Sequence, residues 1–146
     1  MKNIIILGAG VYQKPVYEEA KKLKFKIISI DSNPKAPCRK LSDYFICESF
    51  KKTKNCVNKL KQLKIKLHGI ITFGAEASIN VAEIGKYFSL NTINLTVAKW
   101  TTYKSLRDKR LLKKKIPIPK FMIKKKNKNN KKFKFPFIVK PSDSSG

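Results

Sequence analysis

The segment Asn3-Ile4-Ile5-Ile6-Leu7-Gly8-Ala9-Gly10 decides the fold of this chain. An apolar run without alternation that ends in glycine is typical of a strand buried on both faces of a parallel sheet. Residues 12–23 follow with apolar side chains at helical spacing. The pattern therefore predicts a buried strand at residues 3–7, a tight glycine turn and a helix that returns over the sheet.

The same alternation of strand and helix continues to about residue 88. Further strands are predicted at residues 26–30, 44–47 and 68–73, and further helices at 53–63 and 76–88. Strands that alternate with helices of about a dozen residues indicate right-handed crossovers and a doubly wound parallel sheet. We therefore predict an α/β, Rossmann-like domain.

The pattern changes beyond this region. A helix is predicted at residues 95–114 and an exposed basic loop at 124–134, and strands are predicted at residues 120–123 and 135–140. The predicted domains are residues 1–93 and the beginning of a second unit at residues 94–146.

The net charge of +25 would ordinarily suggest a nucleic acid or an anionic membrane as partner. Only three of the 34 basic residues are arginine, the residue that leads in bidentate phosphate and base recognition, and the lysines are spread along the whole chain. Nucleic-acid binding is therefore disfavoured, although a basic nucleic-acid-binding protein remains a lesser alternative.

Cysteine usage and the N-terminus indicate the compartment. Cys38, Cys47 and Cys56 form no C-x-x-C pair, and His68 stands alone, which disfavours a zinc site or a disulfide framework. The N-terminal apolar run is too short for a signal peptide or a membrane span. We expect a cytoplasmic protein with no membrane partner.

Several polar and glycine residues follow the predicted strands. In open α/β sheets the carboxyl ends of the strands line the ligand crevice. We therefore expect five residues to share one rim and treat them as substrate-binding candidates: Gly8, Gly10, Gln13, Asp31 and Glu76. The structural alternatives stay open, because Asp31 could cap a turn and Glu76 could complement a helix dipole.

Gly8-Ala9-Gly10 together with Asp31 also suggests a dinucleotide site, since the carboxylate has the spacing of a ribose-binding residue. The third glycine of that fingerprint should fall at Gln13, so the signal is weak. A small NAD-type binding module is kept as an alternative.

The C-terminal stretch presents one lysine at the end of an apolar segment, Phe137-Ile138-Val139-Lys140, and then breaks into Pro141-Ser142-Asp143-Ser144-Ser145-Gly146. A semi-buried lysine is usually paired with an anion. Small residues with bare backbone N–H groups next to it favour capture of a phosphate. Composition alone gives no such reason to single out Lys104.

Four segments in order resemble the ATP-grasp superfamily, in the branch with the carbamoyl-phosphate synthase large chain, biotin carboxylase and the purine-pathway ligases. The segments are similar to the family's D-x-N-P-x-A-P, A-x-x-x-T-[DN]-K, G-I-P-x-P-x-F and F-P-x-I-V-K-P motifs, and they lie at residues 31–37, 98–104, 116–121 and 135–141. Two positions depart from the pattern: Tyr103 replaces an Asp or Asn, and Lys115 replaces a glycine.

The resemblance implies an ATP-dependent ligase that phosphorylates a small carboxylate and lets an amine or another nucleophile attack the acyl phosphate. It implies that Lys104 and Lys140 contact the phosphates of ATP, and that Ser144, Ser145 and Gly146 begin the loop over them. The Mg²⁺ ligands of the family would lie downstream, so no metal ligand and no catalytic residue is assigned here. The chain would be an N-terminal fragment, inactive alone, and a homo-oligomer is left open.

Overall fold

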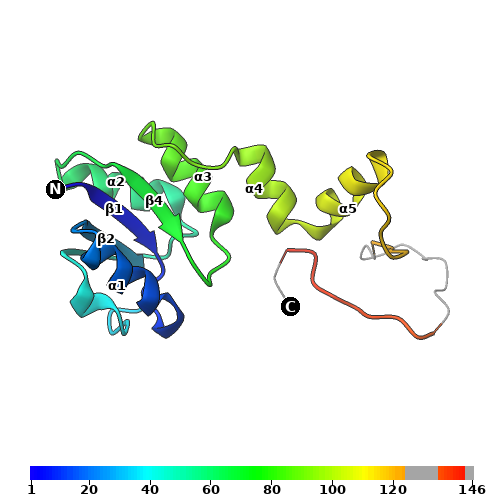
Figure 1. Cartoon of the computed structure of the whole chain (residues 1–146), viewed down its shortest axis with the longest axis horizontal. Helices are drawn as coiled ribbons and strands as arrows, with labels where there is room; N and C mark the ends of the chain where they lie inside the picture. The colour runs from blue at the N-terminus through cyan, green and yellow to red at the C-terminus, as the bar shows by residue number, and fades with distance from the viewer. Residues whose placement is uncertain (124–134, 144–146) are drawn as a thin grey trace.

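The computed structural model describes residues 1–123 and 135–143. Its centre is a four-stranded parallel sheet in the order β3-β2-β1-β4 (Figure 1). In the register of the sheet, Ile5 of the first strand lies beside Ile28 and Ile70 of its two neighbours. The strands are β1 (Asn3–Leu7), β2 (Lys26–Asp31), β3 (Tyr44–Cys47) and β4 (Gly69–Thr72).

Helices connect and follow these strands. A 3₁₀ turn, η1 (Val11–Gln13), leads into α1 (Lys14–Lys22), and a second, η2 (Arg39–Leu41), lies between β2 and β3. The connection from β3 to β4 contains α2 (Thr53–Gln62). The chain then continues through α3 (Ser78–Tyr87), α4 (Leu95–Thr102) and α5 (Lys104–Lys113).

Both faces of the sheet are covered, which explains the continuous apolar run of β1. Ile5 and Leu7 lie in a core cluster with residues of α2 and α3, such as Leu60 and Ile84. Ile6 lies in a second cluster on the other face, with residues of α1. Because successive side chains of a strand point to opposite faces, every position of β1 from Ile4 to Leu7 must be apolar. The predicted parallel α/β fold is thus confirmed.

The C-terminal third differs from its predicted elements. The helix expected at residues 95–114 is two helices, because Tyr103 adopts an extended backbone (φ −92°, ψ 104°) between α4 and α5. The prediction of strands at residues 120–123 and 135–140 was wrong. Neither segment forms a strand, and no described strand lies beside either of them. Ile138 and Val139 are 81% and 83% exposed. An apolar segment becomes a strand only where a neighbour takes up its backbone hydrogen bonds.

Gly85 of α3 should not tolerate a side chain. A Cβ added there would lie 2.3 Å from Cγ2 of Thr92, a short β-branched side chain that cannot swing away without its backbone. We expect Gly85→Ala to lower the free energy of unfolding by about 2 kcal/mol, measured by urea denaturation. Gly69→Ala is the control, because its nearest atom would be Ile4 Cγ2 at 3.8 Å. Equal stability of the two variants would contradict this packing.

Candidate functional site

The glycine turn after β1 is held by the end of β2. Gly8 has a positive φ of 93°, and its N–H donates to Ile30 O at 2.9 Å. The N–H of Ala9 donates to Oδ2 of Asp31 at 2.7 Å, and Oδ1 of the same carboxylate accepts the N–H of Asn33 at 2.8 Å. Both carboxylate oxygens therefore hold backbone N–H groups, so in this structure Asp31 caps two adjacent turns.

Gln13 ties this turn to the end of β4. Its side chain is buried, with 6% exposure. Oε1 accepts the N–H of Gly10 at 2.9 Å, and Nε2 donates to Phe73 O at 2.6 Å. A Cβ on Gly10 would lie 2.8 Å from Oε1, and one on Gly74, which has a φ of 60°, would lie 3.3 Å from Nε2. The glycines therefore make room for the amide of Gln13.

This arrangement weighs against a dinucleotide site. In the fingerprint, a third glycine lets the helix pack closely while the glycine turn approaches a pyrophosphate. Here the amide of Gln13 stands at that position, and the N–H of Gly10 is already engaged by it. The turn is closed by a side chain of its own chain, so the NAD-type alternative loses its strongest support.

A buried polar network lies beneath the turn. The hydroxyl of Tyr17 donates to Gly8 O at 3.0 Å and shares a second hydrogen bond, 2.7 Å long, with the hydroxyl of Ser29. The Ser29 hydroxyl also contacts that of Ser42. This network was not predicted from the sequence. The available signal was Ser29 itself, a hydroxyl within the apolar run of β2.

The Tyr17 hydroxyl makes stability depend on alkaline pH. Burial raises the pKa of Tyr17 to about 12. Because the pKa in the folded protein lies above the unfolded value of about 10, the contribution is fully present below pH 10 and is lost as pH rises through 12.

We expect Tyr17→Phe to lower the free energy of unfolding by about 1 to 2 kcal/mol at pH 8, since Gly8 O and Ser29 lose a buried partner. The difference in the free energy of unfolding between the wild type and Tyr17→Phe should become smaller between pH 10 and pH 12. Denaturant titrations of both proteins across this range measure the gap, and comparison with the variant cancels the titration of the many lysines. A gap that stays constant to pH 12 would contradict the buried position of the hydroxyl.

The structure brings most of the predicted rim together. Four of the five candidates lie at the carboxyl ends of β1 and β2. Asp31 accepts the N–H of Ala9, which stands between Gly8 and Gly10, and Gln13 accepts the N–H of Gly10. Glu76 lies on the connection from β4 to α3, two residues past Gly74, and is exposed. In this rim the side chains of Asp31 and Gln13 already form hydrogen bonds with backbone groups of the protein itself.

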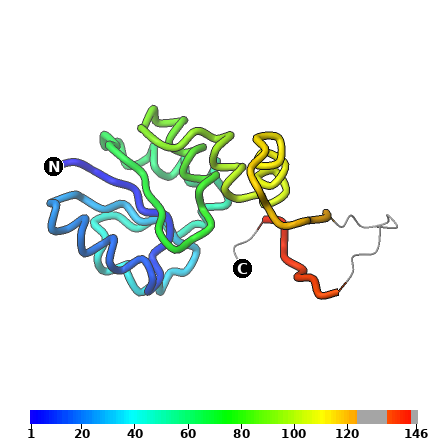
Figure 2. Tube along the Cα trace, turned by 45° about the vertical axis from the view of Figure 1, so that its right-hand side comes forward, coloured from blue at the N-terminus to red at the C-terminus, as the bar shows by residue number. Residues whose placement is uncertain are grey.

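The second group of predicted residues lies around the N-terminus of α5. The N–H of Lys104 donates to Ser142 O at 2.8 Å, and its Nζ donates to Pro141 O at 3.1 Å. The segment that follows Lys140 therefore contacts the first residue of α5. In Figure 2 the red end of the described chain lies near the helices of the C-terminal third.

Lys140 itself is exposed, which corrects the expectation of a semi-buried ammonium. That expectation assumed a strand at residues 135–140 inside a sheet, and no described strand flanks this segment. Ser144, Ser145 and Gly146, the other predicted phosphate-binding residues, lie outside the described residues.

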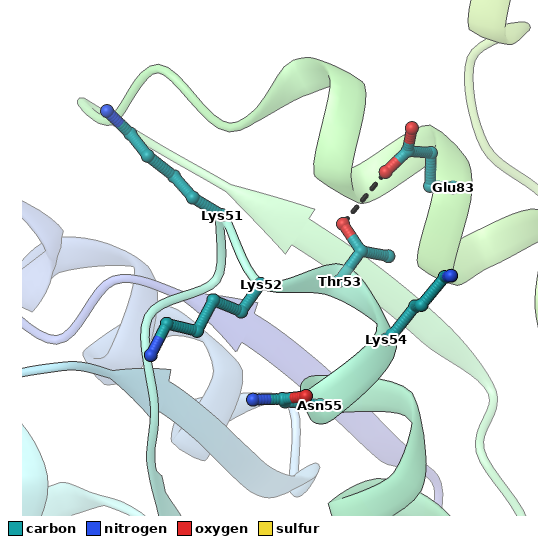
Figure 3. A pocket seen from close by; sticks show the side chains of 6 residues that line it. All are labelled: Lys51, Lys52, Thr53, Lys54, Asn55 and Glu83. Carbon is teal, nitrogen blue, oxygen red and sulfur yellow. Dashed lines mark hydrogen bonds between the residues drawn. The ribbon is translucent and has the colours of Figure 1, made fainter.

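A shallow hollow of about 370 Å³ lies between the start of α2 and α3, away from both groups (Figure 3). The hydroxyl of Thr53 donates to Oε2 of Glu83 across it at 2.8 Å. The side chains of Lys51, Lys52 and Lys54 point in different directions around it. Because these ammonium groups diverge, the hollow does not form an anion site.

Within residues 1–123 and 135–143, no three His, Cys, Asp or Glu side chains are grouped so as to hold a metal ion. None of the helices in the described part of the chain combines the length and apolarity that a bilayer crossing requires.

Known proteins share this architecture. Residues 1–86 match the family described as the ribonucleotide synthetase preATP-grasp domain. A formate-dependent phosphoribosylglycinamide formyltransferase of Prochlorococcus marinus is 32% identical over 63 residues, which are 43% of this chain and 16% of that enzyme.

Solved structures extend the likeness beyond the matched domain. Phosphoribosylglycinamide synthetase from Anaerococcus prevotii is 25% identical with a TM-score of 0.66, over 77% of this chain and 28% of that one. N5-carboxyaminoimidazole ribonucleotide synthetase from Thermotoga maritima is 22% identical with a TM-score of 0.64, over 82% and 32%. The Staphylococcus aureus N5-carboxyaminoimidazole synthetase complexed with ADP is 19% identical with a TM-score of 0.62, over 77% and 29%. The chain thus spans less than a third of the length of these relatives.

Proposed function

The chain belongs to the ribonucleotide synthetase preATP-grasp domain family, and we propose that it forms the N-terminal part of an ATP-dependent ligase that joins a small carboxylate to an amine or another nucleophile. The contact between Lys104 and the Pro141–Ser142 segment carries this proposal. It supports the proposal because Lys140, the residue before Pro141, is thereby held near Lys104 at the N-terminus of α5. The ADP complex of a structural relative supports the same type of ligand.

The two parts of the chain have different tasks in this proposal. Residues 1–93 present the rim of Gly8, Gly10, Gln13, Asp31 and Glu76 to the carboxylate substrate. Because the Asp31 carboxylate and the Gln13 amide hold the turn in shape, they act on the substrate mainly by fixing the backbone around it. Residues 94–146 begin the nucleotide-binding lobe. A cytoplasmic location, and a homo-oligomeric state left open, remain expectations of this proposal.

The lysines neutralise charge in the proposed reaction. Transfer of a phosphoryl group to a carboxylate depends on positioning and on stabilising the charge that spreads over the phosphate oxygens. Ammonium groups of Lys104 and Lys140 would supply part of that charge, with Ser144, Ser145 and Gly146 as further contacts outside the described residues. Mg²⁺, when bound, would neutralise phosphate charge as well. The described residues offer it no cluster of ligands, so no metal ligand is assigned to them.

Nucleotide titrations of the full-length protein test this proposal against the NAD-type alternative. Isothermal titration calorimetry should detect binding of ATP in the presence of Mg²⁺. The fluorescence of NADH, by contrast, should not change when the protein is added. Binding of NADH without binding of ATP would favour the dinucleotide module. Residues 1–146 alone should not turn over ATP, and Lys140-dependent hydrolysis by that polypeptide would contradict the proposed division of the enzyme.

A further inference from the structure

The N-terminus of α5 is capped by a distant part of the chain. The first N–H groups of a helix have no partner within it and need outside acceptors. Tyr103, at the N-cap position, supplies no side-chain acceptor. The N–H of Lys104 instead donates to Ser142 O at 2.8 Å, 38 positions later in the sequence. The segment after Lys140 therefore supplies the acceptor for the first N–H of the helix.

The side chain of Lys104 makes a second bond to the same segment. Its Nζ donates to Pro141 O at 3.1 Å. A proline has no N–H, so its carbonyl is the only backbone group through which it can be held by a hydrogen bond. Two bonds from one residue to two successive carbonyls fix both the place and the direction of the segment. Lys140 is bonded covalently to Pro141 and is located by the same contacts.

We propose that Lys104 is a positioning residue, which holds the Lys140 segment against α5 before any nucleotide is bound. Lys104 then acts on the second lysine as well as on the ligand. The purpose of this anchor rests on the proposed function, whereas its geometry does not.

Hydrogen exchange of the protein without nucleotide tests the anchor. Lys104→Met should raise the exchange rate of the residue 104 amide, whose N–H donates to Ser142 O, about three- to tenfold, because the segment that supplies this acceptor loses one hydrogen bond to a charged, partly exposed donor. The backbone bond to Ser142 survives in this variant. Lys104→Arg keeps a charged donor and should stay within about twofold of the wild type. Lys109→Met is the control, an exposed lysine on the same helix.

Three results would overturn the anchor: unchanged exchange in Lys104→Met, an equal rise in Lys109→Met, or a rise of the same size throughout α5. A separate titration with the ATP analogue AMP-PNP and Mg²⁺ tests the proposed function. If the wild type fails to bind AMP-PNP while Lys104→Met still raises the exchange rate of the residue 104 amide, the ligase proposal fails and the anchor stands.

Discussion

Lys140→Ala is expected to weaken the binding of ATP to the full-length protein by about 30- to 100-fold. The variant removes an ammonium that we place on the phosphates, and a hydrogen bond between a charged donor and an anion contributes about 2 to 3 kcal/mol. The exposed position of Lys140 in the structure is compatible with this role, because its ligand would lie where solvent now has access. Isothermal titration with ATP and Mg²⁺ measures the change.

The control for this experiment is Lys120→Ala. Lys120 is also an exposed lysine of the C-terminal third, so its loss lowers the net charge equally. The affinity of the Lys120→Ala variant for ATP should remain within about twofold of that of the wild type. If Lys140→Ala binds ATP as tightly as this control does, Lys140 has no place in the nucleotide site.

Gln13→Ala is expected to lower the free energy of unfolding by about 3 kcal/mol. The amide satisfies Gly10 N–H and Phe73 O at once, and each backbone group that loses its buried partner costs about 1 to 3 kcal/mol. The removed side chain also leaves a void next to Gly10 and Gly74. The loss is measured by urea denaturation with far-UV circular dichroism.

Gln62→Ala is the matched control, because Gln62 is exposed at the end of α2. It should change stability by less than about 0.5 kcal/mol. A Gln13→Ala protein as stable as the Gln62→Ala protein would mean that the amide of Gln13 does not connect the glycine turn to β4.

The sheet could be predicted from the sequence because its evidence is local. The unbroken apolar run of β1 is stable only when both faces of the strand are buried, and the glycines that follow it mark where the chain must turn. The break at Tyr103 could not be predicted in the same way. It lies in an otherwise continuous helical pattern, and its extended backbone coincides with the contact of Lys104 with Pro141 and Ser142, more than 35 positions away.

The grouping of the candidate residues at the strand ends could be predicted from the sequence, whereas their hydrogen bonds could not. Strand ends placed Gly8, Gly10, Gln13 and Asp31 on one rim. The bond from Gln13 to Phe73 depends on the order of the strands, since β4 must lie next to β1 before the two can meet. The burial expected for Lys140 depended on a neighbouring strand, which the apolar residues 137–139 could not specify.

A double-mutant cycle tests the central claim, that Lys104 and Lys140 meet on one triphosphate. Binding of ATP is measured by calorimetry for the wild type, Lys104→Ala, Lys140→Ala and the double variant. Each single variant should bind ATP more weakly than the wild type. The loss of binding free energy in the double variant should differ from the sum of the two single losses by at least about 0.5 kcal/mol, as for residues that share a partner. Four equal affinities, or losses that simply add, would contradict the claim.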